Sequence, residues 1–125
     1  MTKLPHSKKA PYGTELLINL HSCDTSVFTE QSLLKYLVDI CEQIDMKRHG
    51  EPMFWFDDSD IEHLRGVSAV QFIETSTIVI HSLDILEKVF VNIFSCKPFD
   101  HELAAEFTAR YFGAQGYTKR TMVRD

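Results

Sequence analysis

The sequence predicts an α+β protein, a two-layer α/β sandwich in which one antiparallel sheet carries two helices on one face. Two observations favour this class. Six segments have the apolar content or the apolar–polar alternation of strands, and two others repeat apolar residues at the three- and four-residue steps of a helix. In chain order the elements are β-α-β-β-β-β-α-β, which favours a single sheet with both helices packed against it.

The first half of the chain is expected to form a strand, a helix and a second strand. Residues 12–20 end in an alternation typical of a strand. Thr29 is the predicted N-cap of a helix, with Glu30 near its positive end. Apolar residues then define one helix face as far as Ile44: Leu33, Leu34, Leu37, Val38, Cys41 and Ile44. The apolar residues 53–56 predict a short strand.

The second half is expected to form three strands, a helix and a last strand. The three strands are predicted over residues 67–74, 76–82 and 88–96. Asp100 is the expected N-cap of the second helix, and Gly113 is its expected stop. The tail, residues 117–123, predicts a strand at the edge of the sheet.

The size and composition of the chain predict one domain. Its 125 residues (14.4 kDa) are enough for one hydrophobic core, so we expect a single domain over residues 1–125. Residues 1–11 are expected to be a flexible lead-in because Pro5 and Pro11 bracket a polar stretch. A formal charge of −5 argues against broad binding to nucleic acid or to an anionic membrane.

Targeting signals and cysteine usage favour a cytoplasmic protein. No apolar run approaches the ~20 residues of a membrane span, and the N-terminus lacks the apolar core of a secretory signal. The three cysteines have no CxxC spacing, so neither a disulfide framework nor a zinc site is expected. The acidic residues Asp57, Asp58 and Asp60 lack the glycine and distal glutamate of an EF-hand, so no metal is expected there.

Four polar residues in and beside the central strands suggest chemistry when taken together. Ser68, His81 and Cys96 are each contributed by a different strand, and each carries a nucleophile or a proton carrier. Ser76 lies in the connection between two of these strands, where a tight turn could strain the Thr75–Ser76 peptide. Each residue alone is more often a packed strand residue.

These residues carry a family resemblance. The stretch from GVSAV through ETSTIVIHS and VFVNIFSC to FDHELAAEFTARYFGA, residues 66–114, resembles the prokaryotic S-adenosylmethionine decarboxylase proenzymes. The opening YGTELLINLHSCD is similar to the family's first strand and turn. Ser68, His81 and Cys96 lie 8 residues before, 5 after and 20 after Ser76, which are the offsets that the family uses from its cleavage serine.

The resemblance implies a pyruvoyl-dependent decarboxylase that cleaves itself between Thr75 and Ser76. Ser76 would attack the carbonyl of Thr75 and become the pyruvoyl group, the cofactor whose carbonyl accepts the electrons left by CO₂. His81 would remove the Cα proton, and Ser68 would position the intermediate. Cys96 would return a proton to the substrate, because a thiol donates and accepts protons near neutrality.

Departures from the family pattern leave alternatives open. Thr75 and Thr77 stand where the family has Glu and His, and LDI replaces WPE, which puts Asp84 one position from the expected acidic contact. The chain could therefore be a pyruvoyl-dependent arginine or ornithine decarboxylase, or an unprocessed paralogue that binds a ligand or a partner. The candidate substrate contacts are Asp84 and Trp55, which could stack on an adenine.

Apolar residues on both faces of the expected sheet predict a partner. They are Val70, Phe72, Ile78, Ile80, Val91, Ile93 and Phe94. Two helices cover only one face, so a second copy of the chain would cover the other most economically. The resemblance also implies a homodimer or higher homo-oligomer, a small-molecule substrate, and a product that donates the aminopropyl group in spermidine synthesis.

Overall fold

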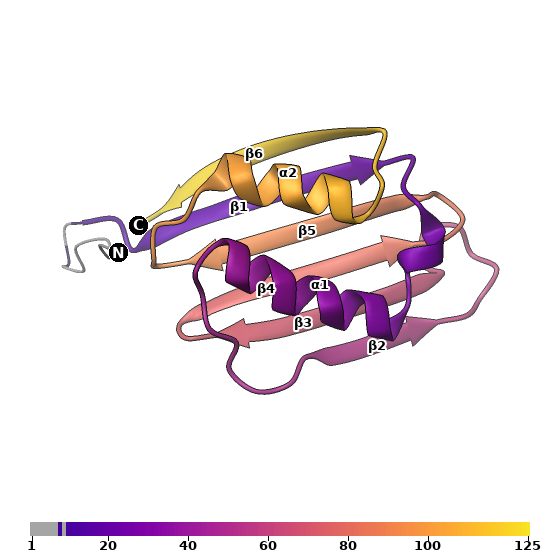
Figure 1. The fold of residues 1–125 in the computed structure, drawn as a ribbon, viewed down its shortest axis with the longest axis horizontal. Helices are drawn as coiled ribbons and strands as arrows, with labels where there is room; N and C mark the ends of the chain where they lie inside the picture. Colours follow the sequence, from indigo (N-terminus) through magenta and orange to yellow (C-terminus); the bar gives the residue numbers. More distant parts are fainter. Residues whose placement is uncertain (1–7, 9) are drawn as a thin grey trace.

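Six antiparallel strands form one sheet, and both helices lie on the same face of it (Figure 1). The computed structural model describes residue 8 and residues 10–125, so most of the expected lead-in (residues 1–7 and 9) lies outside the described residues. The strand order is β2-β3-β4-β5-β1-β6. The elements are β1 (Gly13–His21), a short 3₁₀ helix η1 (Thr25–Val27), α1 (Glu30–Gln43), β2 (Met53–Asp57), β3 (Gly66–Ile73), β4 (Ser76–Leu83), β5 (Lys88–Ser95), α2 (His101–Tyr111) and β6 (Gly116–Arg124). The predicted fold class is confirmed.

Both helices begin at the caps that the sequence predicts. The hydroxyl of Thr29 accepts a hydrogen bond from the backbone N–H of Ser32 at 3.1 Å, and the carboxylate of Asp100 accepts one from Leu103 at 3.0 Å. Gly113 follows α2 with φ +60°, a left-handed conformation that glycine adopts without a Cβ clash. Within the described residues, neither helix is long and apolar enough to cross a membrane.

The hydrophobic core lies between the sheet and the two helices. Alternate residues of β1, β4 and β5 are buried against α1 and α2, and the largest fully buried apolar side chains come from both layers: Leu16, Ile18, Leu20, Leu33, Leu37, Ile40, Ile78, Ile80, Ile93 and Phe112. Each contributes roughly 1.5–3 kcal/mol by leaving water. The hydroxyl groups of Tyr36 and Thr108 are 2.7 Å apart and join α1 to α2 inside this core.

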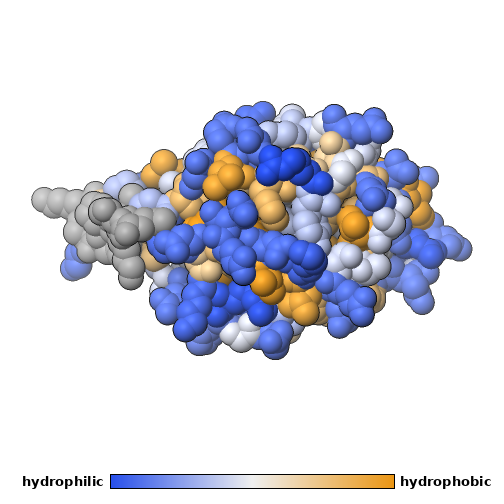
Figure 2. Space-filling model, in the orientation of Figure 1, coloured by the Kyte–Doolittle hydropathy of each residue, from blue (hydrophilic) through white to orange (hydrophobic). Residues whose placement is uncertain are grey.

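The two outer surfaces of the sandwich differ. Seen from the helix side, hydrophilic residues run across the middle of the surface, with hydrophobic ones scattered among them (Figure 2). The opposite face of the sheet is uncovered among the described residues and carries partly exposed apolar side chains: Leu17, Val70, Phe72, Val79, Phe90 and Phe94. The predicted apolar second face is therefore present.

Candidate active site

The hairpin turn between β3 and β4 holds Thr75 in an unfavourable conformation. Ile73 pairs with Ser76, so Glu74 and Thr75 form a two-residue connection. Thr75 has φ +50°, a left-handed conformation that costs a non-glycine residue about 1–2 kcal/mol and is least suited to a β-branched side chain. The unfavourable backbone conformation thus lies in the residue that directly precedes Ser76.

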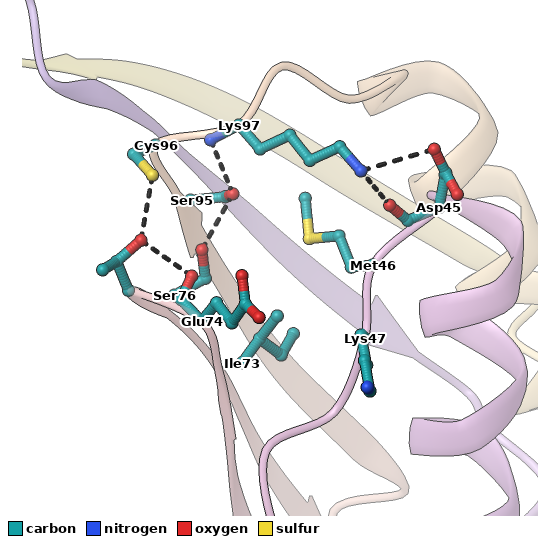
Figure 3. Close-up of a pocket in the computed structure, with 10 residues that line it drawn as sticks. Asp45, Met46, Lys47, Ile73, Glu74, Ser76, Ser95, Cys96 and Lys97 are labelled. Carbon is teal, nitrogen blue, oxygen red and sulfur yellow. Dashed lines mark hydrogen bonds and ion pairs between the residues drawn. The ribbon is translucent and has the colours of Figure 1, made fainter. Parts of the chain in front are cut away.

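Ser76 begins β4 on the helix side of the sheet, and its hydroxyl is held by a second serine. Ser76 is 4% exposed, and its Oγ–H donates to Ser95 Oγ at 2.9 Å (Figure 3). Ser95 Oγ also accepts the backbone N–H of Lys97 at 3.0 Å. Sequence reasoning missed Ser95 as a site residue. Register could have found it, because Thr77 pairs with Phe94 and the next residues along the two strands are Ser76 and Ser95.

The thiol of Cys96 contacts the side chain of Thr75, the residue before Ser76. The Thr75 hydroxyl donates to the carbonyl oxygen of Glu74 at 2.7 Å, and Thr75 Oγ1 is 3.0 Å from Cys96 Sγ. The turn therefore brings Ser76 and Cys96 to the same place, with Thr75 between them.

A cavity of about 420 Å³ opens beside this turn. The turn and the end of β5 line one side of it, and the segment after α1 (Asp45, Met46 and Lys47) lines the other. The ammonium of Lys97 binds both the backbone carbonyl and the carboxylate of Asp45, which ties the two sides together (Figure 3). The volume falls in the range of small-molecule sites.

Ser68 and His81 form a second pair on the uncovered face of the sheet. They are direct neighbours across β3 and β4, and Ser68 Oγ is 2.7 Å from His81 Nδ1. The same cross-strand row continues to Trp55 on one side and Phe90 on the other. A hollow of about 360 Å³ opens over these four residues.

Ser76 and His81 are far apart within one chain. Five strand residues at 3.2–3.4 Å each separate them by about 17 Å, and an odd separation places their side chains on opposite faces. Burial agrees, because Ser76 is buried with the even-numbered residues of β4 while His81 is exposed. The structure thus joins Ser76 with Cys96 and Ser68 with His81, but it does not join the two pairs.

Among the weaker candidates, Trp55 and Asp57 border the hollow over the Ser68–His81 pair. Trp55 is 72% exposed and borders that hollow. Asp84 follows β4, where its carboxylate is 3.7 Å from Arg65 Nε. Asp57, the first of the acidic cluster, accepts two hydrogen bonds from Ser59, which lower the pKa of its carboxyl. The described residues hold no group of three or more His, Cys, Asp or Glu side chains placed for a metal ion.

The fold and the turn define an α+β sandwich with a buried serine behind a strained hairpin residue. Residues 14–125 match the family model described as S-adenosylmethionine decarboxylase. The chain therefore belongs to the S-adenosylmethionine decarboxylase family, a family of carboxy-lyases, and the resemblance predicted from its motifs is confirmed.

A solved structure shares this fold at low sequence identity. The chain is similar to the crystal structure of the adenosylmethionine decarboxylase from Aquifex aeolicus, with a TM-score of 0.77, 14% identity and coverage of 91% of each chain. No curated protein matches the chain by sequence.

Proposed function

We propose that this chain is an S-adenosylmethionine decarboxylase that makes its own pyruvoyl group by cleaving the Thr75–Ser76 bond. Family membership supports decarboxylation of S-adenosylmethionine over decarboxylation of arginine or ornithine. The observation that carries the self-cleavage is the turn itself: a buried serine hydroxyl directly follows a left-handed threonine. Release of that strain favours a reaction that opens the turn.

The first step is an acyl shift within the turn. Ser76 Oγ bonds to the carbonyl carbon of Thr75, and the bond from that carbon to the nitrogen of Ser76 breaks. The hydroxyl proton ends on that nitrogen, so an ester and a free amine replace the amide. Nothing is oxidised or reduced, and no other reactant is needed.

The second step removes the ester. A base takes the Cα proton of Ser76, and Thr75 leaves as a carboxylate that carries the former serine oxygen. The residual dehydroalanine tautomerises and takes up one water, releasing ammonia and leaving the pyruvoyl group at the start of the second fragment. We assign the base to His81. Its Nδ1–H would donate to Ser68, which leaves Nε2 free to accept the proton.

We further propose that the base comes from a second copy of the chain. The separation of about 17 Å excludes a direct proton transfer from Ser76 to His81 within one chain. The Ser68–His81 pair lies on the uncovered, partly apolar sheet face. A second copy packed on this face would cover Phe72 and Phe90 and could present its own pair to the turn.

The residues around Ser76 fit the group that would form there. A pyruvoyl carbonyl, once formed, binds the substrate's amine and accepts the electrons that remain when CO₂ leaves. Cys96 is the proton donor to the substrate's Cα in this proposal, because its thiol lies one hydrogen bond from Thr75, beside the reacting residue. The adjoining cavity of about 420 Å³ offers room for the substrate.

The same proposal places the enzyme in the cytoplasm with a small-molecule substrate. The free cysteines Cys23, Cys41 and Cys96 are compatible with a reducing compartment. The net charge of −5 disfavours nucleic acid as a partner. Exposed Trp55 lies in the same cross-strand row as Ser68 and His81, so a second copy that presents this pair to the turn would also bring its Trp55, the candidate surface for stacking on the adenine of the substrate.

Mixing two inactive variants tests the shared site. Ser76→Ala lacks the nucleophile and His81→Ala lacks the base, so neither alone should complete cleavage. If each site combines a turn with the partner's pair, co-expression gives mixed dimers with one intact site, and up to about half of the His81→Ala chains should be cut. No cleavage above the separate variants would contradict a shared site.

Release of labelled CO₂ tests the substrate. Carboxyl-labelled S-adenosylmethionine should lose its label, whereas arginine and ornithine should not. Turnover of arginine or ornithine alone would replace the proposed substrate. The same assay on the Ser76→Ala variant measures the background, because that variant cannot form the pyruvoyl group.

A further inference from the structure

Self-cleavage requires the hydroxyl of Ser76 to point in one direction. A lone pair on Oγ must face the carbonyl carbon of Thr75, so the O–H bond must point away from it. In the structure the hydroxyl of Ser76 donates to Ser95 Oγ at 2.9 Å, across the β4–β5 register (Figure 3). Because Ser76 is the donor, this hydrogen bond holds the hydroxyl proton of Ser76 toward Ser95. It does not use the lone pairs of Ser76 Oγ, one of which must attack the carbonyl carbon.

Ser95 is itself held in place. It is fully buried, and its oxygen accepts both the hydroxyl of Ser76 and the backbone N–H of Lys97, which uses its two lone pairs. The side chain of Lys97 is in turn bound to Asp45, just beyond α1. The acceptor for the nucleophile's proton is therefore fixed by the backbone rather than by a mobile side chain.

We propose that Ser95 is a positioning residue for self-cleavage, which aims Ser76 Oγ at the carbonyl carbon of Thr75. This inference rests on the proposed function. Ser95 acts only through its hydrogen bond and gains or loses no atoms in the acyl shift. Its effect belongs to the first step, because the hydroxyl that it holds becomes the ester oxygen.

The test compares variants at Ser95 with a matched buried serine. Ser95→Ala should slow cleavage about 10- to 100-fold, the size expected when a reacting atom loses its alignment. Ser95→Thr keeps the hydroxyl and should cleave faster than Ser95→Val, which has the same shape without it. The control is Ser82→Ala, since Ser82 is also fully buried in the sheet and donates a single hydrogen bond, to the carbonyl of Val67 at 2.7 Å.

Hydroxylamine separates the steps, because it cuts an ester but not an ordinary amide. The uncut Ser95→Ala chain should resist hydroxylamine, which places the block before the ester. Thermal melting should show Ser95→Ala and Ser82→Ala destabilised by similar amounts, while only Ser95→Ala cleaves slowly. If Ser95→Ala does not fold, the test is the ratio of the cleavage rates of Ser95→Thr and Ser95→Val.

Several results would overturn the inference. They are wild-type cleavage in Ser95→Ala, equal slowing in Ser82→Ala, equal rates for the Thr and Val variants, or an uncut Ser95→Ala chain that hydroxylamine cuts at residue 76. Failure of the wild-type chain to cleave would instead reject the proposed function, and the inference with it. The wild-type sample therefore distinguishes the two failures.

Discussion

Strain at Thr75 should speed self-cleavage, and two substitutions at this position measure by how much. Thr75→Ala keeps the unfavourable left-handed φ of +50°, whereas Thr75→Gly removes its cost. Both variants lose the hydroxyl that contacts Cys96, so the comparison isolates the backbone. The left-handed conformation costs about 1–2 kcal/mol. If the transition state releases all of it, the Ala variant should cleave roughly 5–30 times faster than the Gly variant.

The assay is a cleavage time course of the freshly refolded chain, followed by gel electrophoresis and intact mass. Melting of both variants in a Ser76→Ala background, where no cleavage occurs, measures the strain separately. There the Gly variant should be more stable, by up to about 1 kcal/mol after its larger unfolded-state entropy is counted.

Glu87 provides the matched control. It has φ +54° in the connection between β4 and β5, away from the reacting residues. Its Ala and Gly variants should differ in stability as those of Thr75 do, yet cleave at the same rate. The reasoning is refuted if Thr75→Gly cleaves as fast as Thr75→Ala although melting reveals the strain.

Two further outcomes follow from single side chains. Cys96→Ala should still cleave itself, but its decarboxylation rate should fall about 10²–10⁴-fold, measured as CO₂ release per cleaved chain. The control is Cys23→Ala, which removes a similarly buried thiol and should keep its turnover. Burial, aided by the charge of Lys119, lowers the pKa of His101 in the folded chain below its ordinary value of 6.5. As the pH falls, His101 is therefore protonated in the unfolded chain before it is protonated in the folded chain. Thermal stability should therefore fall below about pH 6.5, and His101→Gln should flatten that fall whereas the exposed His49→Gln should not. A decline of the same slope in His101→Gln would exclude this histidine as its cause.

Local signals were enough to predict the helices and strands. The caps at Thr29 and Asp100 act within one helical turn, and the alternation in β4 and β5 reflects burial on one face. The order of the strands in the sheet could not be predicted from such local signals. That β1 lies between β5 and β6 depends on pairings between residues far apart in the chain, which periodicity does not encode.

The candidate site could be predicted only in part. The offsets identify Ser68, Ser76, His81 and Cys96, but not which of them meet. The odd separation of Ser76 and His81 already implies opposite faces of the sheet, a signal that the sequence carries. The left-handed φ of Thr75 could not be predicted, because local preference disfavours that conformation for a β-branched residue and only the hairpin imposes it.

Intact mass spectrometry of the purified chain tests the central claim most directly. We expect two fragments, residues 1–75 and residues 76–125. The second should be lighter by one ammonia than the same fragment beginning with serine, and it should be blocked to Edman degradation. Ser76→Ala, which cannot start the acyl shift, should give one uncut chain. A wild-type chain that stays uncut after prolonged incubation would contradict the account, as would a second fragment that begins with an unmodified serine.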